Sequence, residues 1–147
     1  MAETGANLRS NLKIIGVIPA RMHSERLPGK VLQPIAGRAM VHRVFDAAQS
    51  CGHLSELWVA TDSPEVRDYC REHRIPVLMT APTHTSGTER IYEVSQAMPA
   101  EVYVNIQGDE PMLSGSHLDL LLEPFFQDPS VQVTRSEERR VGKECRL

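Results

Sequence analysis

The chain has 147 residues, of which 41% are hydrophobic, and its formal net charge at pH 7 is −3. This length and composition predict a single globular domain with a buried core. The segment 135–147 holds five of the 16 Arg and Lys residues but only three of the 19 Asp and Glu residues, so the remainder is the more acidic part. Such a charge balance argues against nucleic acid as the main partner.

The cysteines and the first residues of the chain bear on whether the protein is cytoplasmic, secreted or membrane-bound. Cys51, Cys70 and Cys145 are odd in number and include no C-x-x-C pair, which argues against a disulfide framework or a zinc site. Reduced cysteines favour the cytoplasm. The polar segment 1–11 and the short apolar run after it resemble neither a signal peptide nor a membrane span. We therefore expect a cytoplasmic protein without membrane insertion.

Short apolar runs alternate along the chain with segments whose apolar residues recur at helical spacing. The predicted strands span 12–18, 56–60, 77–79 and 102–106. The predicted helices span 40–48, 64–73, 87–98 and 118–122. Strands that alternate with helices imply parallel pairing and right-handed crossover connections. The sequence therefore predicts an α/β fold with a doubly wound, mostly parallel sheet.

Several residues mark the ends of the predicted helices. Ser63 is placed to cap a helix whose first residue is Pro64, and Ser86 has capping-box spacing to Glu89. Gly52 stands where the C-terminus of a helix favours a left-handed residue. These residues predict where the helices begin and end, and so where the connecting loops lie.

The chain after residue 118 gives a weaker pattern. We expect Pro124 to interrupt the last helix, because proline lacks the amide hydrogen that the helix needs. The apolar residues in 131–134 predict the beginning of a fifth strand.

Two loops of opposite charge follow the first and the fourth predicted strands. The first loop carries Arg21, Arg26 and Lys30, and the fourth carries Asp109 and Glu110. Loops that follow parallel strands open on one edge of the sheet, so these two should face the same cleft. Cations suit phosphate oxygens, and Mg²⁺ is usually held by one or two carboxylates together with phosphates. The pairing predicts a magnesium nucleotide site; a solvated cationic loop and an acidic helix cap remain the alternatives.

Other polar residues in these loops give little sign of chemistry. His23 and His84 have no partner at metal-ligand spacing. Ser24 lacks the G-x-S-x-G elbow of a hydrolase nucleophile. We expect neither a histidine metal site nor a covalent nucleophile.

Four loop motifs together resemble one enzyme family. They read PARMHSERLPGK after the first strand, VATD after the second, HTSGTER after the third and NIQGDEP after the fourth. In this order, over about 13–134, they resemble the N-terminal part of the 3-deoxy-manno-octulosonate cytidylyltransferases, or CMP-Kdo synthetases. The CMP-sialate synthetases are similar in the first loop but lack this combination.

The resemblance implies a Rossmann-like nucleotidyltransferase. Such an enzyme transfers CMP from CTP to the sugar acid Kdo, releases pyrophosphate and serves lipopolysaccharide biosynthesis. In the family pattern Arg21 and Lys30 would hold the triphosphate, with Ser24 and Arg26 nearby, and Asp109 would bind Mg²⁺.

The remaining motifs imply substrate-binding residues. Gln107 and the Thr61–Asp62 segment would shape the nucleotide and sugar pocket, and Arg90 is a candidate for a sugar or phosphate contact. A sugar hydroxyl attacks the α-phosphorus in line while pyrophosphate leaves, so the protein must position two anionic substrates. This chemistry needs no covalent protein nucleophile.

The chain also departs from the family, whose longer members have a second half with a further metal-binding aspartate, much of the sugar site and the dimer contacts. We therefore expect 12–134 to be a partial nucleotidyltransferase domain that lacks turnover, and the full-length family protein to be a homodimer. The charged segment 135–147, RSEERRVGKECRL, matches nothing in the family pattern and is interpreted as a non-native tail. The alternatives are a nucleotide-binding fragment without turnover, a CMP-sialate-type cytidylyltransferase and a structural interaction protein.

Overall fold

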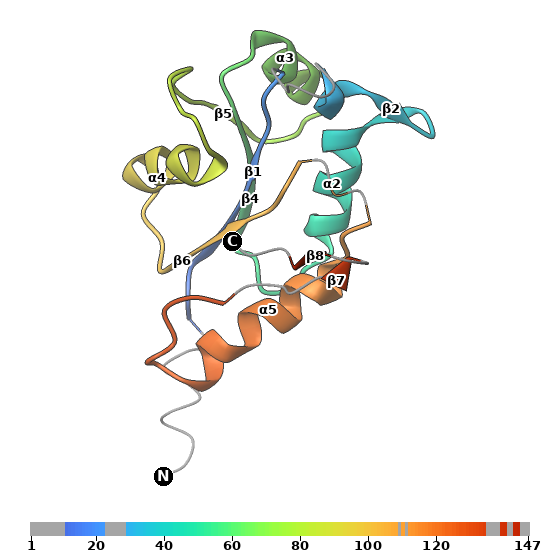
Figure 1. The fold of residues 1–147 in the computed structure, drawn as a ribbon. Coiled ribbons are helices and arrows are strands. Elements are labelled where there is room, and N and C mark those ends of the chain that lie inside the picture. The colour runs from blue at the N-terminus through green and yellow to red at the C-terminus, as the bar shows by residue number, and fades with distance from the viewer. Residues whose placement is uncertain are drawn as a thin grey trace.

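The computed structural model describes residues 11–22, 29–108, 110, 112–134, 139–140 and 143–144, and these form an α/β fold around a parallel sheet (Figure 1). The four strands pair in the order β5-β4-β1-β6. They are β1 (Ile14–Pro19), β4 (Glu56–Thr61), β5 (Val77–Met79) and β6 (Val102–Asn105). All four predicted strands and their parallel pairing are confirmed.

Four α-helices cover the two faces of this sheet. They are α2 (Met40–Gln49), α3 (Pro64–Glu72), α4 (Gly87–Ala97) and α5 (Gly115–Gln127). Apolar residues of α2, α3 and α5 pack on one face, whereas those of α4 pack on the other (Figure 1). The shorter elements are η1 (Lys30–Leu32), the hairpin of β2 (Pro34–Ile35) and β3 (Arg38–Ala39), and the pair β7 (Arg139–Arg140) and β8 (Lys143–Glu144).

Strand β1 lies between two partners and is buried on both faces. It pairs in parallel with β4, where Ile15 is opposite Glu56, and with β6, where Ile14 is opposite Val102. The fully buried side chains of β1 are Ile14, Ile15, Val17 and Ile18. A strand covered on both faces needs such a continuous apolar run, which explains why its signal in the sequence was clear.

The strand order reverses between β1 and β6. From β1 the chain moves outward through β4 to β5, and α4 then carries it back across the opposite face to β6. The loops after β1 and β6 therefore leave neighbouring strands in different directions. Ligands of open α/β sheets bind in the crevice at such a point, beyond the carboxyl ends of the strands. The expected proximity of the first and fourth loops is thus confirmed.

The prediction that Gly52 ends α2 in a left-handed conformation was wrong. The helix ends at Gln49, and its C-cap is Ser50 in the right-handed helical region. The Ser50 hydroxyl donates to the carbonyl of Ala47 at 2.7 Å, and the amide of Cys51 donates to that of Ala48 at 3.0 Å. The last carbonyls of α2 are thus satisfied without a left-handed residue.

Two predictions for the chain after residue 118 were also wrong. Helix α5 continues through Pro124 to Gln127, because its residues Leu122 and Phe125 are buried in the core and their packing outweighs the lost hydrogen bond. Residues 131–134 form no strand. There the Thr134 hydroxyl donates to a carbonyl of α5 at 2.7 Å, and no sheet partner lies alongside among the described residues.

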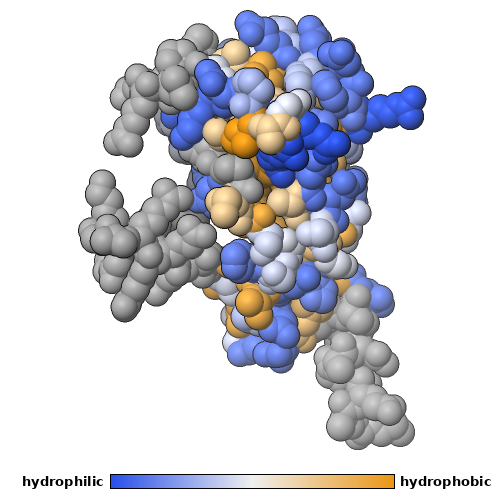
Figure 2. Space-filling view, turned by 90° about the vertical axis from the view of Figure 1, so that its right-hand side faces the viewer, coloured by the Kyte–Doolittle hydropathy of each residue, from blue (hydrophilic) through white to orange (hydrophobic). Residues whose placement is uncertain are grey.

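The surface is mixed in character. Figure 2 shows the side that carries α2 and the β2–β3 hairpin, where hydrophilic residues cover most of the surface and a group of hydrophobic residues lies between them. The large apolar side chains exposed in the described part of the chain are Met79, Tyr92, Met112, Leu120 and Val133. None of the helices described has the length and apolar character needed to cross a membrane.

Gly115, the first residue of α5, lies very close to the main chain at the C-terminus of α2. A Cβ atom on Gly115 would lie 2.6 Å from the main-chain nitrogen of Cys51 and from the carbonyl carbon of Ser50. Gly115→Ala should therefore lower the free energy of unfolding by about 1–3 kcal/mol, as overpacking does. Gly52→Ala is the matched control, since its Cβ would meet nothing within 4 Å, and we expect a change within about 0.5 kcal/mol. Urea denaturation measures both, and equal stabilities would contradict the close approach.

Candidate functional site

Three segments meet at the carboxyl ends of β1 and β6. They are the residues after β1, the N-terminus of α4 and the loop after β6. A Cβ on Gly108 would lie 3.1 Å from the carbonyl oxygen of Pro19, and one on Gly87 would lie 3.3 Å from the Pro19 ring. Gly87 and Gly108 therefore allow α4 and the β6 loop to approach the end of β1. The contacts define a site at the point where the strand order reverses.

Arg21 and Lys30 lie at the two ends of the loop that follows β1. The amide of Gly29 donates to the carbonyl of Met22 at 2.7 Å, which closes the loop at its base and brings the residues outside this bond together. Gly29 has a φ of 75°, a left-handed conformation that glycine adopts without strain. The fold thus places both predicted phosphate-binding cations at the same edge of the sheet, as the sequence implied.

Gln107 lies in the third segment, directly before Gly108. Its side-chain amide donates to the side-chain oxygen Oδ1 of Asn105 at 3.3 Å, so the last residue of β6 orients the first residues of the loop. A Cβ on Gly87 would lie 3.9 Å from the side-chain nitrogen Nδ2 of Asn105. The Asn105 side chain therefore lies close to the start of α4. The sequence offered this residue only as the first letter of the NIQGDEP motif and assigned it no role.

Thr61 and Asp62 stand at the end of the neighbouring strand β4. The amide of Ala20 donates to the carbonyl of Ala60 at 2.9 Å, which joins the ends of β1 and β4. The buried Thr61 accepts a hydrogen bond from the Ser63 amide at 3.1 Å through its hydroxyl. This hydroxyl therefore shapes the turn into α3, whereas the half-buried Asp62 lies at the edge of the site.

Arg90 is buried, with 3% of its surface exposed. Its guanidinium donates to the hydroxyl of Thr80 and, at 3.4 Å, to the carbonyl of Ala81. These oxygens belong to the loop between β5 and α4, so Arg90 fastens that loop to the first turn of the helix. A direct contact between Arg90 and a substrate stays a prediction.

Two carboxylates of α4 also bind this loop. Glu89 accepts from the Thr85 amide at 2.7 Å and from its hydroxyl at 3.2 Å, and these bonds lower the pKa of Glu89. Glu93 accepts from the Ala81 amide at 2.9 Å and from His84, and the pKa of Glu93 is lowered mainly by the amide and further by the histidine. The donors stabilise the ionised carboxylates.

The capping box predicted for α4 is present, and Thr85 adds to it. The Ser86 hydroxyl accepts from the Glu89 amide at 3.2 Å, as expected for a helix N-cap. The Glu89 carboxylate binds chiefly the amide of Thr85, and a weaker hydrogen bond with the Ser86 main chain also lowers the pKa of Glu89. These bonds fix the chain just before the helix.

Three of the predicted site residues, Ser24, Arg26 and Asp109, lie outside the described residues, and their roles stay predictions. The described residues on either side of Asp109 form a turn in which the Glu110 amide donates to the carbonyl of Gln107 at 3.3 Å. Within the described ranges no group of three or more His, Cys, Asp or Glu side chains could hold a metal ion.

The buried cysteines give no sign of a nucleophile. Burial raises the pKa of the Cys70 thiol to about 11, and burial together with a hydrogen bond to Asp119 raises that of Cys51 to about 11. Neither thiol reaches the site at the ends of β1 and β6, since Cys51 follows α2 and Cys70 lies in α3. Both therefore remain protonated and unreactive at neutral pH.

Comparison with known proteins identifies the family. The sequence profile of the cytidylyltransferases matches residues 15–144. A 3-deoxy-manno-octulosonate cytidylyltransferase from Acidobacterium capsulatum is 49% identical over 125 residues, which cover 85% of this chain and 51% of the relative. The enzyme of that name from Escherichia coli is 40% identical over 121 residues, 82% of this chain and 49% of the relative. The chain thus spans about half the length of these curated relatives.

Solved structures agree with the sequence relatives. The structure of a CMP:2-keto-3-deoxy-manno-octonic acid synthetase complexed with CTP superposes with a TM-score of 0.79 at 40% identity, covering 81% of this chain and 49% of the other. A cytidylyltransferase from Leptospira borgpetersenii gives a TM-score of 0.72 at 19% identity, covering 82% and 51%. The second likeness supports the fold alone.

The position of Arg21 and Lys30 at the base of one loop predicts an anion site. Arg21→Ala and Lys30→Ala should each weaken the binding of inorganic triphosphate, because a charge-assisted hydrogen bond contributes about 1.5–3 kcal/mol. That energy corresponds to roughly tenfold to a hundredfold in affinity. Isothermal titration calorimetry measures the change.

Lys13→Ala provides the control for these two variants. Lys13 directly precedes β1 at the opposite edge of the sheet, where it pairs with Glu56 at 3.2 Å. Its removal changes the net charge as the other two variants do, and we expect triphosphate binding to remain unchanged. Equal losses in all three variants would mean that only net charge matters.

Proposed function

Since this chain belongs to the cytidylyltransferase family, we propose that it carries the nucleotide site of an enzyme that transfers CMP from CTP to Kdo. The observation that carries the proposal is the approach of Gly108 to Pro19 and Val31 at the switch point of the sheet, which puts the loop after β6 beside the two ends of the segment that carries Arg21 and Lys30. Arg21, Lys30 and Gly108 each lie in a loop motif whose resemblance to the CMP-Kdo synthetases was apparent in the sequence. The identity of 49% to such an enzyme supports the same assignment.

The proposed reaction is an in-line displacement at phosphorus. A hydroxyl of Kdo attacks the α-phosphorus of CTP and loses its proton to solvent as the new phosphorus–oxygen bond forms, and pyrophosphate leaves with the electrons of the bond that breaks. The side chains of Arg21 and Lys30 would bind the triphosphate and neutralise charge on the leaving group. Asp62, Arg90 and Gln107 would help to bind the nucleotide or the sugar. The product, CMP-Kdo, would supply lipopolysaccharide biosynthesis.

We further propose that Mg²⁺ accompanies the nucleotide. Bound Mg²⁺ neutralises charge on the triphosphate, and it needs only one or two carboxylates when phosphates supply its other ligands. Asp109 would provide one carboxylate in the family pattern.

Location and assembly follow from the same assignment. We propose a cytoplasmic protein, and the described cysteines, Cys51 and Cys70, form no disulfide, which fits a reducing compartment. The longer family protein would form a homodimer. Nucleotide binding without turnover is the behaviour we propose for the 147-residue chain itself, because it spans only half of its relatives.

Nucleotide and acceptor choice test the proposed function. A chimeric protein that continues this chain with the second half of a curated relative should release pyrophosphate from CTP in the presence of Kdo. ATP, GTP and sialic acid should be poor substitutes. The 147-residue chain should bind CTP and release no pyrophosphate, because the sugar site is incomplete. Preference for a purine nucleotide or for sialic acid would overturn the assignment, and turnover by the short chain would show that it suffices.

Asp109 and Glu110 are adjacent carboxylates, so matched substitutions at the two positions can show which one binds the metal. In the same chimeric protein Asp109→Asn should abolish turnover that depends on Mg²⁺, because the family pattern puts the ligand at the first acid. Glu110→Gln changes the charge equally and should retain most of the activity. Titration of each variant with Mg²⁺ separates the two, and a larger loss from the Glu110 change would reassign the ligand.

A further inference from the structure

The loop of residues 80–86 is held by polar contacts rather than by apolar packing. From residue 81 to residue 86 every side chain is exposed or half-buried. The hydrogen bonds that hold the loop come mainly from the first two turns of α4, through Glu89, Arg90 and Glu93. The position of the loop therefore depends on a few side chains of the helix that follows it.

His84 and Glu93 join two separate points of this loop. The Nε2 atom of His84 lies 3.0 Å from Oε1 of Glu93, and the same oxygen accepts from the Ala81 amide at 2.9 Å. The other ring nitrogen, Nδ1, lies 3.9 Å from Oε2 of Glu89. One carboxylate oxygen thus connects the beginning of the loop with its middle, and the imidazole lies between two acids of α4.

The end of this loop leads directly into the site. Ser86 caps α4, and the first helical residue is Gly87, on which a Cβ atom would lie 3.3 Å from the ring of Pro19 and 3.9 Å from the side-chain nitrogen of Asn105. A displacement of the loop would move this first turn relative to the ends of β1 and β6. His84 lies in the loop before these residues and Glu93 in the second turn of α4, so the pair can control the position of the helix N-terminus without touching a ligand.

We infer that His84 and Glu93 are positioning residues of the nucleotide site, which hold the loop 80–86 and the first turn of α4 in the conformation that binds CTP. This inference rests on the proposed function, because it concerns the same site. It assigns a role to the histidine of the HTSGTER motif, for which neither a metal nor a catalytic function was indicated. The pair acts through the loop and makes no contact with substrate.

Because His84 and Glu93 lie at the surface, their effect on CTP binding can be measured apart from their effect on the stability of the fold. The side chains of His84 and Glu93 are 17% and 36% exposed, so the core does not depend on them. Arg90, by contrast, is buried beneath the same loop, and its removal would disturb the fold itself. Loss of the His84–Glu93 bond should therefore weaken CTP binding while the protein remains folded.

The experiment measures the affinity of the 147-residue chain for CTP with Mg²⁺ by calorimetry. We expect His84→Ala and Glu93→Ala each to weaken binding by about five- to tenfold, less than the full effect of a hydrogen bond to a charged group, because the pair acts on the ligand only through the loop. The melting temperature should fall by no more than about 3 °C. His84→Gln should restore most of the affinity, because the glutamine amide can donate to Glu93 from the position of Nε2.

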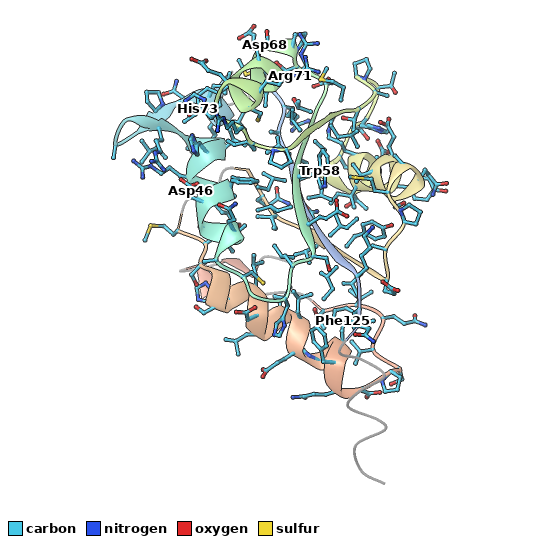
Figure 3. The ribbon with its side chains drawn as sticks, turned by 180° about the vertical axis from the view of Figure 1, so that it is seen from behind. Asp46, Trp58, Asp68, Arg71, His73 and Phe125 are labelled. Carbon is cyan, nitrogen blue, oxygen red and sulfur yellow. The ribbon has the colours of Figure 1, made fainter. Side chains whose placement is uncertain are left out.

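Two further measurements show whether the loop is what changes. Hydrogen exchange at the Ala81 amide should become faster in His84→Ala, with or without nucleotide, because its acceptor Glu93 is no longer held. Trp58, the single tryptophan of the chain, lies on the side of β4 that faces α4 (Figure 3), so its unchanged emission would show that the helix still packs on the sheet. In the double variant the loss should be smaller than the product of the two single losses, since both remove one interaction.

His53→Ala is the matched control. His53 lies 3.9 Å from the carboxylate of Asp119 near the amino end of β4, at the edge of the sheet opposite the site. Its removal should leave CTP binding unchanged. The inference is overturned if the wild-type chain binds CTP and His84→Ala binds it equally well, if His53→Ala weakens binding as much, or if exchange at Ala81 does not change. Failure of the wild-type chain to bind CTP would instead refute the proposed function, and the inference with it.

Discussion

Strand β1 has a parallel neighbour on each side, and the reversal of strand order at this position creates the site. Because β4 and β6 both pair with it, the loops that leave their carboxyl ends lie around a common point. The sheet itself needs only buried aliphatic side chains such as Ile15 and Val17 to keep this arrangement. Different parts of β1 therefore serve stability and binding. The middle of the strand packs in the core, and its carboxyl end lies at the surface beside the site.

Small residues and polar contacts convert this arrangement into a specific site. Gly87 and Gly108 remove the side chains that would keep α4 and the β6 loop away from Pro19. Thr61 and Arg90 then fix the neighbouring loops through buried hydrogen bonds. The hydrogen bonds of Thr61 and Arg90 thus hold the loops, and the cationic and amide side chains at the edge do not have to do so.

Much of this fold could be predicted from the sequence, because β-branched runs and helix N-caps are local signals. Ser63 and Ser86 cap the helices that they were expected to cap. The wrong predictions concerned Gly52, Pro124 and residues 131–134, where tertiary packing or side-chain hydrogen bonds decided the conformation. For the candidate site, the topology rule placed the first and fourth loops together, and family resemblance supplied the roles. The burial of Arg90 and the function of Asn105 depend on contacts between distant segments, and no local pattern encodes them.

The hydrogen bond between Gly29 and Met22 bears on how this family can diverge. It closes the first loop at its base, so the spacing between the two flanking cations is set by a main-chain contact and not by the residues between them. A change in the number of residues between Met22 and Gly29 would then leave the main chain at Arg21 close to that at Lys30. Protein engineers could therefore vary the contributions of Ser24 and Arg26 to binding while the two flanking cations stay in register.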